Sequence, residues 1–190
     1  MHIYAFHTLM KFTYKALTPT LFFALLTLSH VARSDYPVAP EFTLPSQDNP
    51  IQLSKLQGKL VYVDFWASWC RPCKTSFPWM ISMKEKFKDH PFEIVAINLD
   101  KDKTLADAFI KSQAINFPVA FNPNADVAEK YGVEGMPSSY LVDAHGHLRI
   151  RYTGFWNKSK DEKEQMIKRL LKQMKNTTNT TANTTHLVEE

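Results

Sequence analysis

The chain has 190 residues, of which 44% are hydrophobic and 22% are charged, and its formal net charge at pH 7 is +4. This length and composition predict one soluble globular domain with a substantial core, flanked by terminal segments. Without residues 1–34 the chain carries 20 basic against 19 acidic side chains, a net charge of +1, so the charge balance gives no basis for a nucleic acid partner.

Residues 1–34 have the features of a secretory signal peptide. Lys11 and Lys15 precede an almost uncharged apolar run, and the sequence "ARS" at residues 32–34 is a small-x-small cleavage pattern. A membrane anchor that stays uncleaved is the alternative, although polar residues interrupt the apolar run. Either form predicts export, and we expect the mature protein to lie in the periplasm.

The middle of the chain alternates between strand and helix patterns. Residues 59–67, "KLVYVDFWA", are a continuous run of apolar, aromatic and β-branched side chains, which is typical of a strand buried on both faces. Residues 92–100 repeat this pattern, and residues 71–89 between them have apolar side chains at helical spacing. A strand, a helix and a second strand in this order predict a parallel strand pair with a right-handed crossover.

The elements that follow complete a mixed sheet. Gly146 lies in a turn between two short runs rich in β-branched and aromatic residues, which predicts an antiparallel hairpin. The further predicted elements are helices at residues 104–114, 125–132 and 160–175, and strands at residues 138–143 and 148–154. Together they predict an α/β fold with one mixed central sheet and helices on both of its faces.

Residues 176–190 are a low-complexity segment that contains three Asn-Thr-Thr repeats. With so few apolar side chains the segment cannot bury enough surface to offset the entropy lost on ordering, so it is predicted to be disordered. The sequence therefore predicts three parts: a signal peptide at residues 1–34, a domain at residues 35–175 and this tail.

The chain has two cysteines, Cys70 and Cys73, which follow the first long strand and open the helix after it. Ligands and chemistry tend to lie at this edge of open α/β sheets. The start of a helix offers free N–H groups and the positive end of the helix dipole, which favour a thiolate. Pro72 fits the first helical turn, where its missing N–H would be unpaired anyway. We therefore expect Cys70 to be reactive.

Three other uses of the cysteine pair fit the sequence less well. A structural zinc site needs four ligands and would have to recruit distant histidines such as His145 and His147. A structural disulfide over so short a loop would constrain the unfolded chain little. A copper-binding or metallochaperone-like module, in which the pair joins a histidine at one soft site, stays open as the alternative to redox catalysis.

The segment "VDFWASWCRPCK" resembles the active-site segment of thioredoxins, and residues 40–154 resemble the exported TlpA/ResA family. The likeness includes "FTLPS", "FEIVAINLD", "FPVAFNPNADVAEKYGVEGMPSSYLVD" and "GHLRIRYTG". It implies a thioredoxin fold with an added N-terminal β-hairpin and a strand-helix insertion at about residues 92–117. It also implies a thiol-disulfide oxidoreductase that needs no cofactor beyond its redox-active Cys70–Cys73 disulfide.

The resemblance implies catalytic roles for three residues. Cys70 would be the exposed nucleophile that attacks a substrate disulfide, and Cys73 would release the product by attacking the mixed disulfide. Asp64, six residues before Cys70 on the buried strand, would accept the proton of Cys73. The apolar neighbours of Asp64 predict that it is buried rather than solvent-facing, and burial would raise its pKa.

The resemblance also implies a substrate-binding surface beside the cysteines. Pro137 matches the cis-proline of the fold, and a cis peptide would turn the Met136 backbone toward the cleft, where it can pair with an extended substrate. Trp69 is expected to rim the site as an apolar contact surface, while Trp66 is expected to pack in the core.

The expected partners are disulfide-containing proteins and a membrane thiol-electron donor of the DsbD/CcdA type, and the protein is expected to be a monomeric disulfide reductase. ResA-like proteins usually carry an acid three residues after the second cysteine, where this chain has Ser76. Family members devoted to cytochrome c maturation often have an acid directly after the cis-proline, where this chain has Ser138. A role in cytochrome c maturation stays open, but these departures favour a less specialised thiol reductant.

Overall fold

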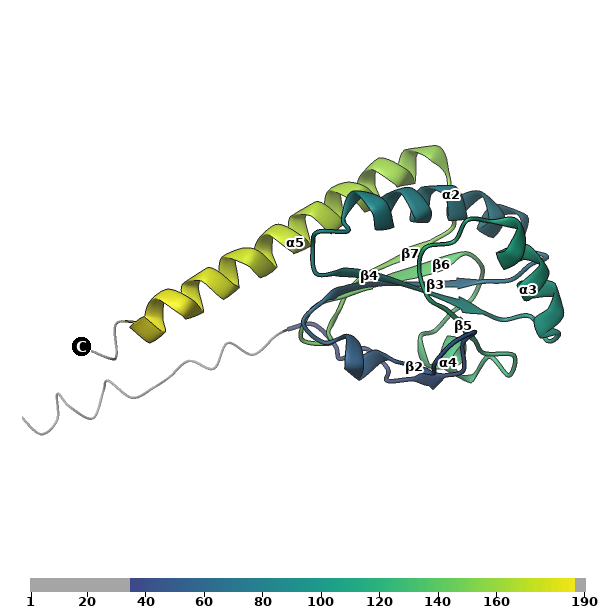
Figure 1. Cartoon of the computed structure of the whole chain (residues 1–190), viewed down its shortest axis with the longest axis horizontal. Helices are drawn as coiled ribbons and strands as arrows, with labels where there is room; N and C mark the ends of the chain where they lie inside the picture. The colour runs from purple at the N-terminus through teal and green to yellow at the C-terminus, as the bar shows by residue number, and fades with distance from the viewer. Residues whose placement is uncertain (1–34, 187–190) are drawn as a thin grey trace, which may run out of the picture. The chain divides into compact units, whose positions relative to one another are not determined.

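Five strands form one central sheet in the computed structural model, which describes residues 35–186 and the side chains of residues 35–177. The strand order is β5-β4-β3-β6-β7 (Figure 1). The strands are β3 (Leu60–Trp66), β4 (Phe92–Asn98), β5 (Val119–Phe121), β6 (Ser138–Val142) and β7 (Leu148–Thr153). Because β3 pairs parallel with β4 and antiparallel with β6, the sheet is mixed, and the prediction of a mixed sheet is confirmed.

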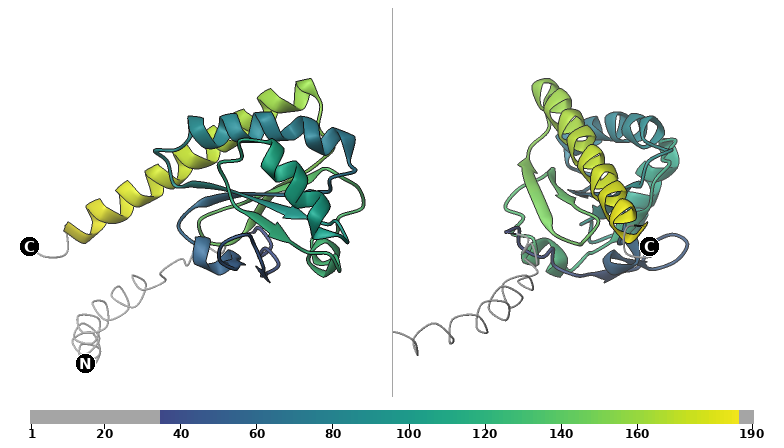
Figure 2. Two further views of the ribbon diagram at one scale, coloured as in Figure 1. Left: turned by 45° about the vertical axis from the view of Figure 1, so that its right-hand side comes forward. Right: turned by 90° about the vertical axis from the view of Figure 1, so that its left-hand side faces the viewer.

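Helices cover both faces of this sheet (Figures 1 and 2). One face carries α2 (Arg71–Lys86), α3 (Lys103–Ser112) and α5 (Asn157–His186), and the other carries α4 (Asp126–Lys130), strands β1 (Thr43–Leu44) and β2 (Ile51–Gln52), and the 3-10 turn η1 (Leu53–Leu56). The buried side chains accordingly form two clusters, one on each face. The predicted α/β class, with helices on both faces, is confirmed.

The central strand β3 determines which side chains lie on the face of the sheet that α2 covers. All of its residues are buried, as its continuous apolar run predicts. Since successive side chains of a strand point to opposite faces, Tyr62 and Trp66 join the cluster under α2 and α5, whereas Val63 and Phe65 join the other cluster. By the same alternation Asp64 faces the layer of α2 and α5, where it is an acid within an apolar cluster.

The N-terminal hairpin, which is a separate two-stranded sheet, and the strand-helix unit match the expectations from the sequence. β1 pairs antiparallel with β2 and forms the N-terminal hairpin. β4 and α3 form the strand-helix unit expected at about residues 92–117. The turn between β6 and β7 contains Gly146 at a φ of 83°, a backbone conformation that glycine adopts without steric cost.

Strand β5 was not among the predicted strands. It follows Pro118 and has three residues, "VAF". Three residues are too few to show an alternating or a continuous strand pattern. Its place beside β4 comes from pairing: Ala96, Ile97 and Asn98 align with its three residues in parallel register. A tertiary contact thus creates a strand that local sequence does not specify.

Helix α5 is longer than the sequence predicts. The structure continues it to His186, whereas residues 176–190 are predicted to be a disordered tail. Within this extension the Thr177 hydroxyl donates a hydrogen bond to the Gln173 carbonyl at 3.1 Å. Extending an existing helix adds one backbone hydrogen bond for each residue fixed, so a polar segment can continue a helix that is anchored by earlier residues. The boundary predicted at residue 176 is therefore not an end of helical structure.

The predicted signal peptide, residues 1–34, lies outside the described residues, as do residues 187–190. Among the helices that the structure describes, none is both long enough and apolar enough to cross a membrane.

Candidate active site

Cys70 and Cys73 form a disulfide at the point where β3 leads into α2. Cys70 is the N-cap residue of α2, and its sulfur accepts a hydrogen bond from the Cys73 backbone N–H at 3.3 Å. Pro72 lies in the first turn, as predicted, where no helical acceptor exists for an N–H. The predicted position of the pair is confirmed, and the N–H groups and positive dipole end at this helix start favour a thiolate on Cys70.

The two cysteines differ in exposure, although less than the sequence suggests. Cys70 is 6% exposed and Cys73 is completely buried. Cys70 was expected to be exposed, and in this disulfide form it is nearly covered. Its sulfur points into the first turn of α2, where it is bonded to Cys73 and accepts the N–H bond described above. Cys70 is still the more exposed of the two cysteines, because it keeps some solvent-accessible surface whereas Cys73 has none.

Asp64 is buried on the face of the sheet that α2 covers, and its burial is as its apolar neighbours predict. It is 1% exposed, and its Oδ2 atom has no hydrogen-bond partner among the described residues. Burial raises the pKa of Asp64 to about 7, and the positive charge of Lys163 acts in the opposite direction. An acid with such a pKa can both accept and release a proton near neutral pH, which suits a general acid-base group.

Lys163 on α5 is a part of this site that was not predicted. Its side chain is 1% exposed. Its Nζ donates to the Ser139 hydroxyl at 2.9 Å and to the Tyr62 hydroxyl at 3.3 Å, while the Tyr62 hydroxyl donates to Ser139 at 2.7 Å. A sequence signal was present, because Lys163 lies four residues before the buried Ile167 and therefore on the apolar face of the helix.

The loop before β6 brings Pro137 to the same end of the sheet. The Met136–Pro137 peptide bond is cis, so this prediction is confirmed. Ser138, the first residue of β6, aligns with Phe65 near the end of β3 that leads to the cysteines. The loop is held on both sides, because the Gly154 N–H donates to the Pro137 carbonyl at 2.7 Å and the Ser138 hydroxyl donates to the Gly135 carbonyl at 2.7 Å.

The two tryptophans of the cysteine segment occupy different environments, as predicted. Trp66 is fully buried and packs edge-on against Phe77 with ring centroids 4.8 Å apart. Trp69, next to Cys70, is 69% exposed. A second exposed tryptophan, Trp156, was not predicted to matter, and it follows the glycine that holds the Pro137 loop. Both exposed rings offer apolar surface to a partner.

The loop between β3 and Cys70 is braced by Asp100. The Asp100 carboxylate accepts hydrogen bonds from the Ser68 backbone N–H at 2.9 Å, from the Ser68 hydroxyl at 3.0 Å and from the Asn98 amide at 2.7 Å. Asp100 is buried, so these three bonds satisfy a group that would otherwise be costly to bury. The brace connects the end of β4 to the approach to the cysteines and keeps that approach in one conformation.

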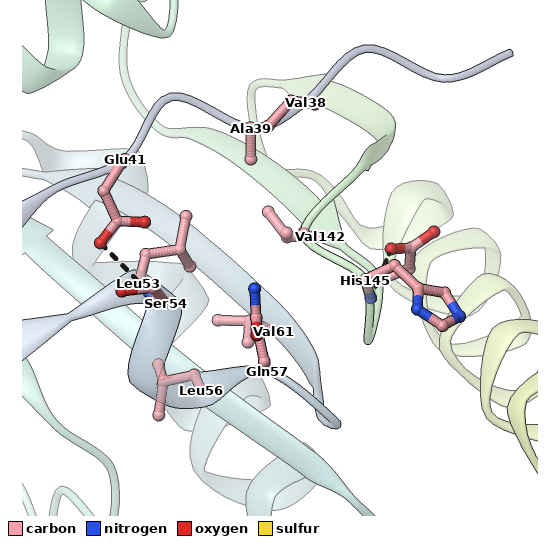
Figure 3. Close-up of a pocket in the computed structure, with 12 residues that line it drawn as sticks. Val38, Ala39, Glu41, Leu53, Ser54, Leu56, Gln57, Val61, Val142 and His145 are labelled. Carbon is pink, nitrogen blue, oxygen red and sulfur yellow. Dashed lines mark hydrogen bonds between the residues drawn. The ribbon is translucent and has the colours of Figure 1, made fainter. Parts of the chain in front are cut away.

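A separate hollow of about 110 Å³ lies at the other end of the sheet (Figure 3). Val61 near the start of β3 and Val142 at the end of β6 line it, whereas the cysteines follow the far end of β3. The Glu41 carboxylate at its wall accepts a hydrogen bond from the Ser54 backbone N–H at 3.1 Å. The hollow is therefore not part of the cysteine site.

Within the described residues, no group of three or more His, Cys, Asp or Glu side chains is placed to hold a metal ion. The copper-binding alternative requires a histidine beside the cysteine pair. No specific observation in this geometry favours that alternative.

Comparison with known proteins identifies the family. Residues 37–151 match the AhpC/TSA family. The thiol-disulfide oxidoreductase ResA of Bacillus subtilis (strain 168) is 37% identical over 122 residues, which are 64% of this chain and 68% of that protein. Two solved structures are also similar. One, from Chlorobium tepidum, is named as a thiol:disulfide interchange protein DsbE and has a TM-score of 0.70 and 42% identity, covering 72% of this chain and 96% of that chain. The other, from Bacteroides thetaiotaomicron, is named as a protein disulfide isomerase and has a TM-score of 0.66 and 28% identity, covering 72% and 89% of the two chains.

The matched segment, residues 37–151, contains both cysteines, Asp64 and the cis-proline loop. The relatives are named for thiol-disulfide exchange, which is the chemistry that a disulfide at a helix N-terminus supports. The fold, the cysteine pair and the relatives agree: the chain belongs to the AhpC/TSA family and is a thioredoxin-like thiol-disulfide oxidoreductase.

Proposed function

We propose that this protein reduces disulfide bonds of other proteins in the periplasm, with Cys70 as the attacking thiolate. The observation that carries the proposal is the difference in burial: Cys70 keeps some exposed surface, whereas Cys73 and Asp64 are buried. A substrate disulfide therefore meets Cys70 first. Cys73 can act only on a substrate that is already bonded to Cys70.

The proposed cycle starts from the reduced pair. The Cys70 thiolate attacks one sulfur of the substrate disulfide, and the other substrate sulfur leaves as a thiolate that takes a proton from solvent. Cys73 then gives its proton to the Asp64 carboxylate, and its thiolate attacks the Cys70 sulfur of the mixed disulfide. The second substrate sulfur leaves as a thiolate, and the Cys70–Cys73 disulfide forms. The substrate gains two electrons, and the cysteine pair loses them.

The surface around Cys70 is proposed to hold the substrate. Trp69 offers an exposed apolar ring next to the nucleophile, and the loop containing Met136 and Pro137 lies at the same end of the sheet. An extended peptide can form main-chain hydrogen bonds with such a loop while an apolar side chain rests on the ring. These contacts are weakly selective, which suits a protein that reduces several substrates.

Two features support the reducing direction. Strong oxidants of this type owe their oxidising power to a stabilised reduced form. Here a single N–H among the described residues, that of Cys73, donates to the Cys70 sulfur, and a buried acid lies on the strand below. The Cys70 sulfur thus accepts one hydrogen bond in the disulfide form, and an ionised Asp64 on the face of the sheet under α2 would oppose the charge of a thiolate in the reduced form. The Arg71-Pro72 dipeptide between the cysteines also resembles that of reducing proteins.

The proposed partners follow from the cycle. Each turnover leaves the disulfide form, so a dithiol must reduce it again, and a membrane thiol-electron donor of the DsbD/CcdA type is the proposed source. The predicted signal peptide and the resemblance to the exported TlpA/ResA family support a place outside the cytoplasm. We propose that the protein acts there as a monomer, since each domain carries a complete cysteine site.

The reduction potential tests the direction of the reaction. We expect equilibration of the cysteine pair with glutathione buffers to give a value more negative than about −200 mV, in the range of thioredoxins and glutaredoxins. The fraction of disulfide would be measured by alkylation and mass spectrometry. A value near that of the oxidant DsbA, about −120 mV, would contradict the reductase proposal and favour an oxidase.

Replacing Cys73 by serine is expected to trap substrates. Cys70 can still attack the substrate disulfide, but the Cys73 thiolate that releases the mixed disulfide is missing. The variant purified from periplasmic extract should carry covalent partners that dithiothreitol releases and that mass spectrometry identifies. The matched control is Cys70→Ser, which keeps Cys73 and should trap nothing, because Cys73 is completely buried. Equal trapping by both variants would refute the assigned order of attack.

A further inference from the structure

Helix α5 carries a buried charge that the cycle above does not use. Lys163 is 1% exposed in a cluster of apolar side chains, and no carboxylate lies within ion-pair distance of its Nζ among the described residues. Burying an ammonium without an ion pair is costly, so neutral groups must compensate for part of the cost. Lys163 also lies beyond residues 37–151, so the family match does not assign it a role.

The surroundings of Lys163 hold its ammonium in one place. Ser139 and Tyr62 accept hydrogen bonds from Nζ through their hydroxyl groups. The ring of Tyr152 lies 4.4 Å from Nζ, and the rings of Tyr62 and Phe155 each lie 5.8 Å away. Two hydroxyl oxygens and three aromatic faces form a neutral cage that is suited to a cation.

This cage lies next to Asp64. Ser139, which binds Nζ, is the residue directly opposite Asp64 in the β3–β6 pairing. Side chains directly opposite each other in an antiparallel pair share a face and have Cβ atoms about 5 Å apart. Tyr62, the second residue that binds Nζ, precedes Asp64 by two positions on β3 and therefore points to the same face. Nζ therefore binds the side chain opposite Asp64 and the side chain two positions before it, so the ammonium lies close to the Asp64 carboxylate.

We propose that Lys163 is a positioning residue for the exchange reaction: its ammonium, held by Ser139 and Tyr62, favours the ionised form of the Asp64 carboxylate, which can then accept the Cys73 proton. The inference rests on the role proposed above for Asp64. It adds that a charge from α5, which lies outside the segment that carries the cysteines, acts on the proposed proton acceptor.

The other groups around the pair do not compete for this role. Burial raises the pKa values of Tyr62 and Tyr152, so both hydroxyls stay neutral at physiological pH. Burial lowers the pKa of Lys163 to about 8, and the charges of Asp64 and Glu162 act in the opposite direction. Lys163 therefore carries its charge below about pH 8. Lys163 is the cation that acts on the pKa of Asp64, which burial alone would raise further.

The test removes this charge and follows Asp64 directly. In the Lys163→Met and Lys163→Gln variants, the titration midpoint of the Asp64 carboxyl carbon, measured by carbon-13 NMR on the reduced protein, should move to higher pH. A shift of one to three units is typical for a lost opposite charge. Methionine fills the volume without charge, and glutamine also keeps a donor for Ser139. If one variant does not fold, the titration is measured on the other. Lys163→Arg should restore the midpoint.

The matched control is Lys172→Met, which removes the same charge from an exposed position of the same helix and should leave the midpoint in place. A folded Lys163→Gln or Lys163→Met variant with an unmoved Asp64 midpoint would overturn the inference. An equal shift in Lys172→Met would also overturn it, because any lysine of α5 would then suffice.

Kinetics separate this inference from the proposed function. Below the wild-type midpoint, release of the mixed disulfide should slow about tenfold for each unit that the Asp64 midpoint rises, since the carboxylate fraction falls by that factor. The first attack, by Cys70, should keep its rate. If the NMR midpoint moves and the release rate does not, Lys163 controls Asp64 as inferred, and the role of Asp64 as proton acceptor is the part that fails.

Discussion

Replacing Cys70 by serine should abolish disulfide reduction and leave the fold intact. A serine hydroxyl is not ionised at neutral pH and cannot form a mixed disulfide, so the first step has no nucleophile. The fold should survive because Cys70 is the N-cap of α2, and serine is among the preferred N-cap residues. The assay is reduction of insulin with dithiothreitol as electron source, which should fall to the rate of dithiothreitol alone.

This experiment also separates an enzyme from a module that only binds partners. If the domain worked by presenting a surface such as the exposed ring of Trp69, the Cys70→Ser variant would keep its function. Near-ultraviolet circular dichroism would show that the variant is folded. A folded variant that reduces insulin faster than dithiothreitol alone would show that Cys70 is not the nucleophile.

Much of the fold could be predicted because its central elements have strong local patterns. The run "KLVYVDFWA" indicates a buried strand by composition alone, and the structure buries every residue of β3. The helix after Cys70 has a cap, a first-turn proline and helical spacing, and the structure starts α2 at Arg71. Strand β5 could not be predicted, because its three residues become a strand only by pairing with β4.

The site was predictable where it depends on the cysteine segment and not where it depends on the C-terminal helix. The burial of Asp64 follows from its apolar neighbours, and the cis peptide at Pro137 follows from the family resemblance. Neither a local run of apolar neighbours nor the family resemblance predicts the place of Lys163 in the site. It is 99 positions from Asp64 in the sequence, and a lysine in a charged helix is most often solvated. Its spacing to Ile167 places it on the apolar face of α5, but only the packing of α5 against the sheet places it beside an acid.

Asp64→Asn is the substitution expected to have the second largest effect. Asparagine keeps the shape of the side chain and cannot take the Cys73 proton. The attack by Cys70 should change little, because that step needs no proton acceptor. Release of the mixed disulfide through Cys73 should slow by roughly 10²- to 10⁴-fold, the usual effect of losing an acid-base group.

The same substitution should change stability in a way that depends on pH. The pKa of Asp64 is about 7 in the folded protein against 3.8 as the ordinary value, so between about pH 4 and pH 7 the folded state keeps a proton that the unfolded state has lost. The free energy of unfolding of the wild type therefore falls as pH rises through this window, and it reaches its full loss above about pH 7. The loss is at most on the order of 4 kcal/mol. Asparagine removes this dependence, although the Lys163 ammonium left without its acid offsets part of the gain.

Stopped-flow kinetics with a disulfide peptide separate the two effects of Asp64→Asn. Formation of the mixed disulfide and its release are followed as successive phases between pH 6 and 8, and urea unfolding at pH 5 and pH 8 gives the stability difference. We expect the second phase alone to slow, and the variant to gain stability relative to the wild type at pH 8 more than at pH 5. A variant that releases its mixed disulfide at the wild-type rate across this range would exclude Asp64 as the acceptor. Asp64 would then be a buried acid that lowers the stability of the fold and has no role in the exchange reaction.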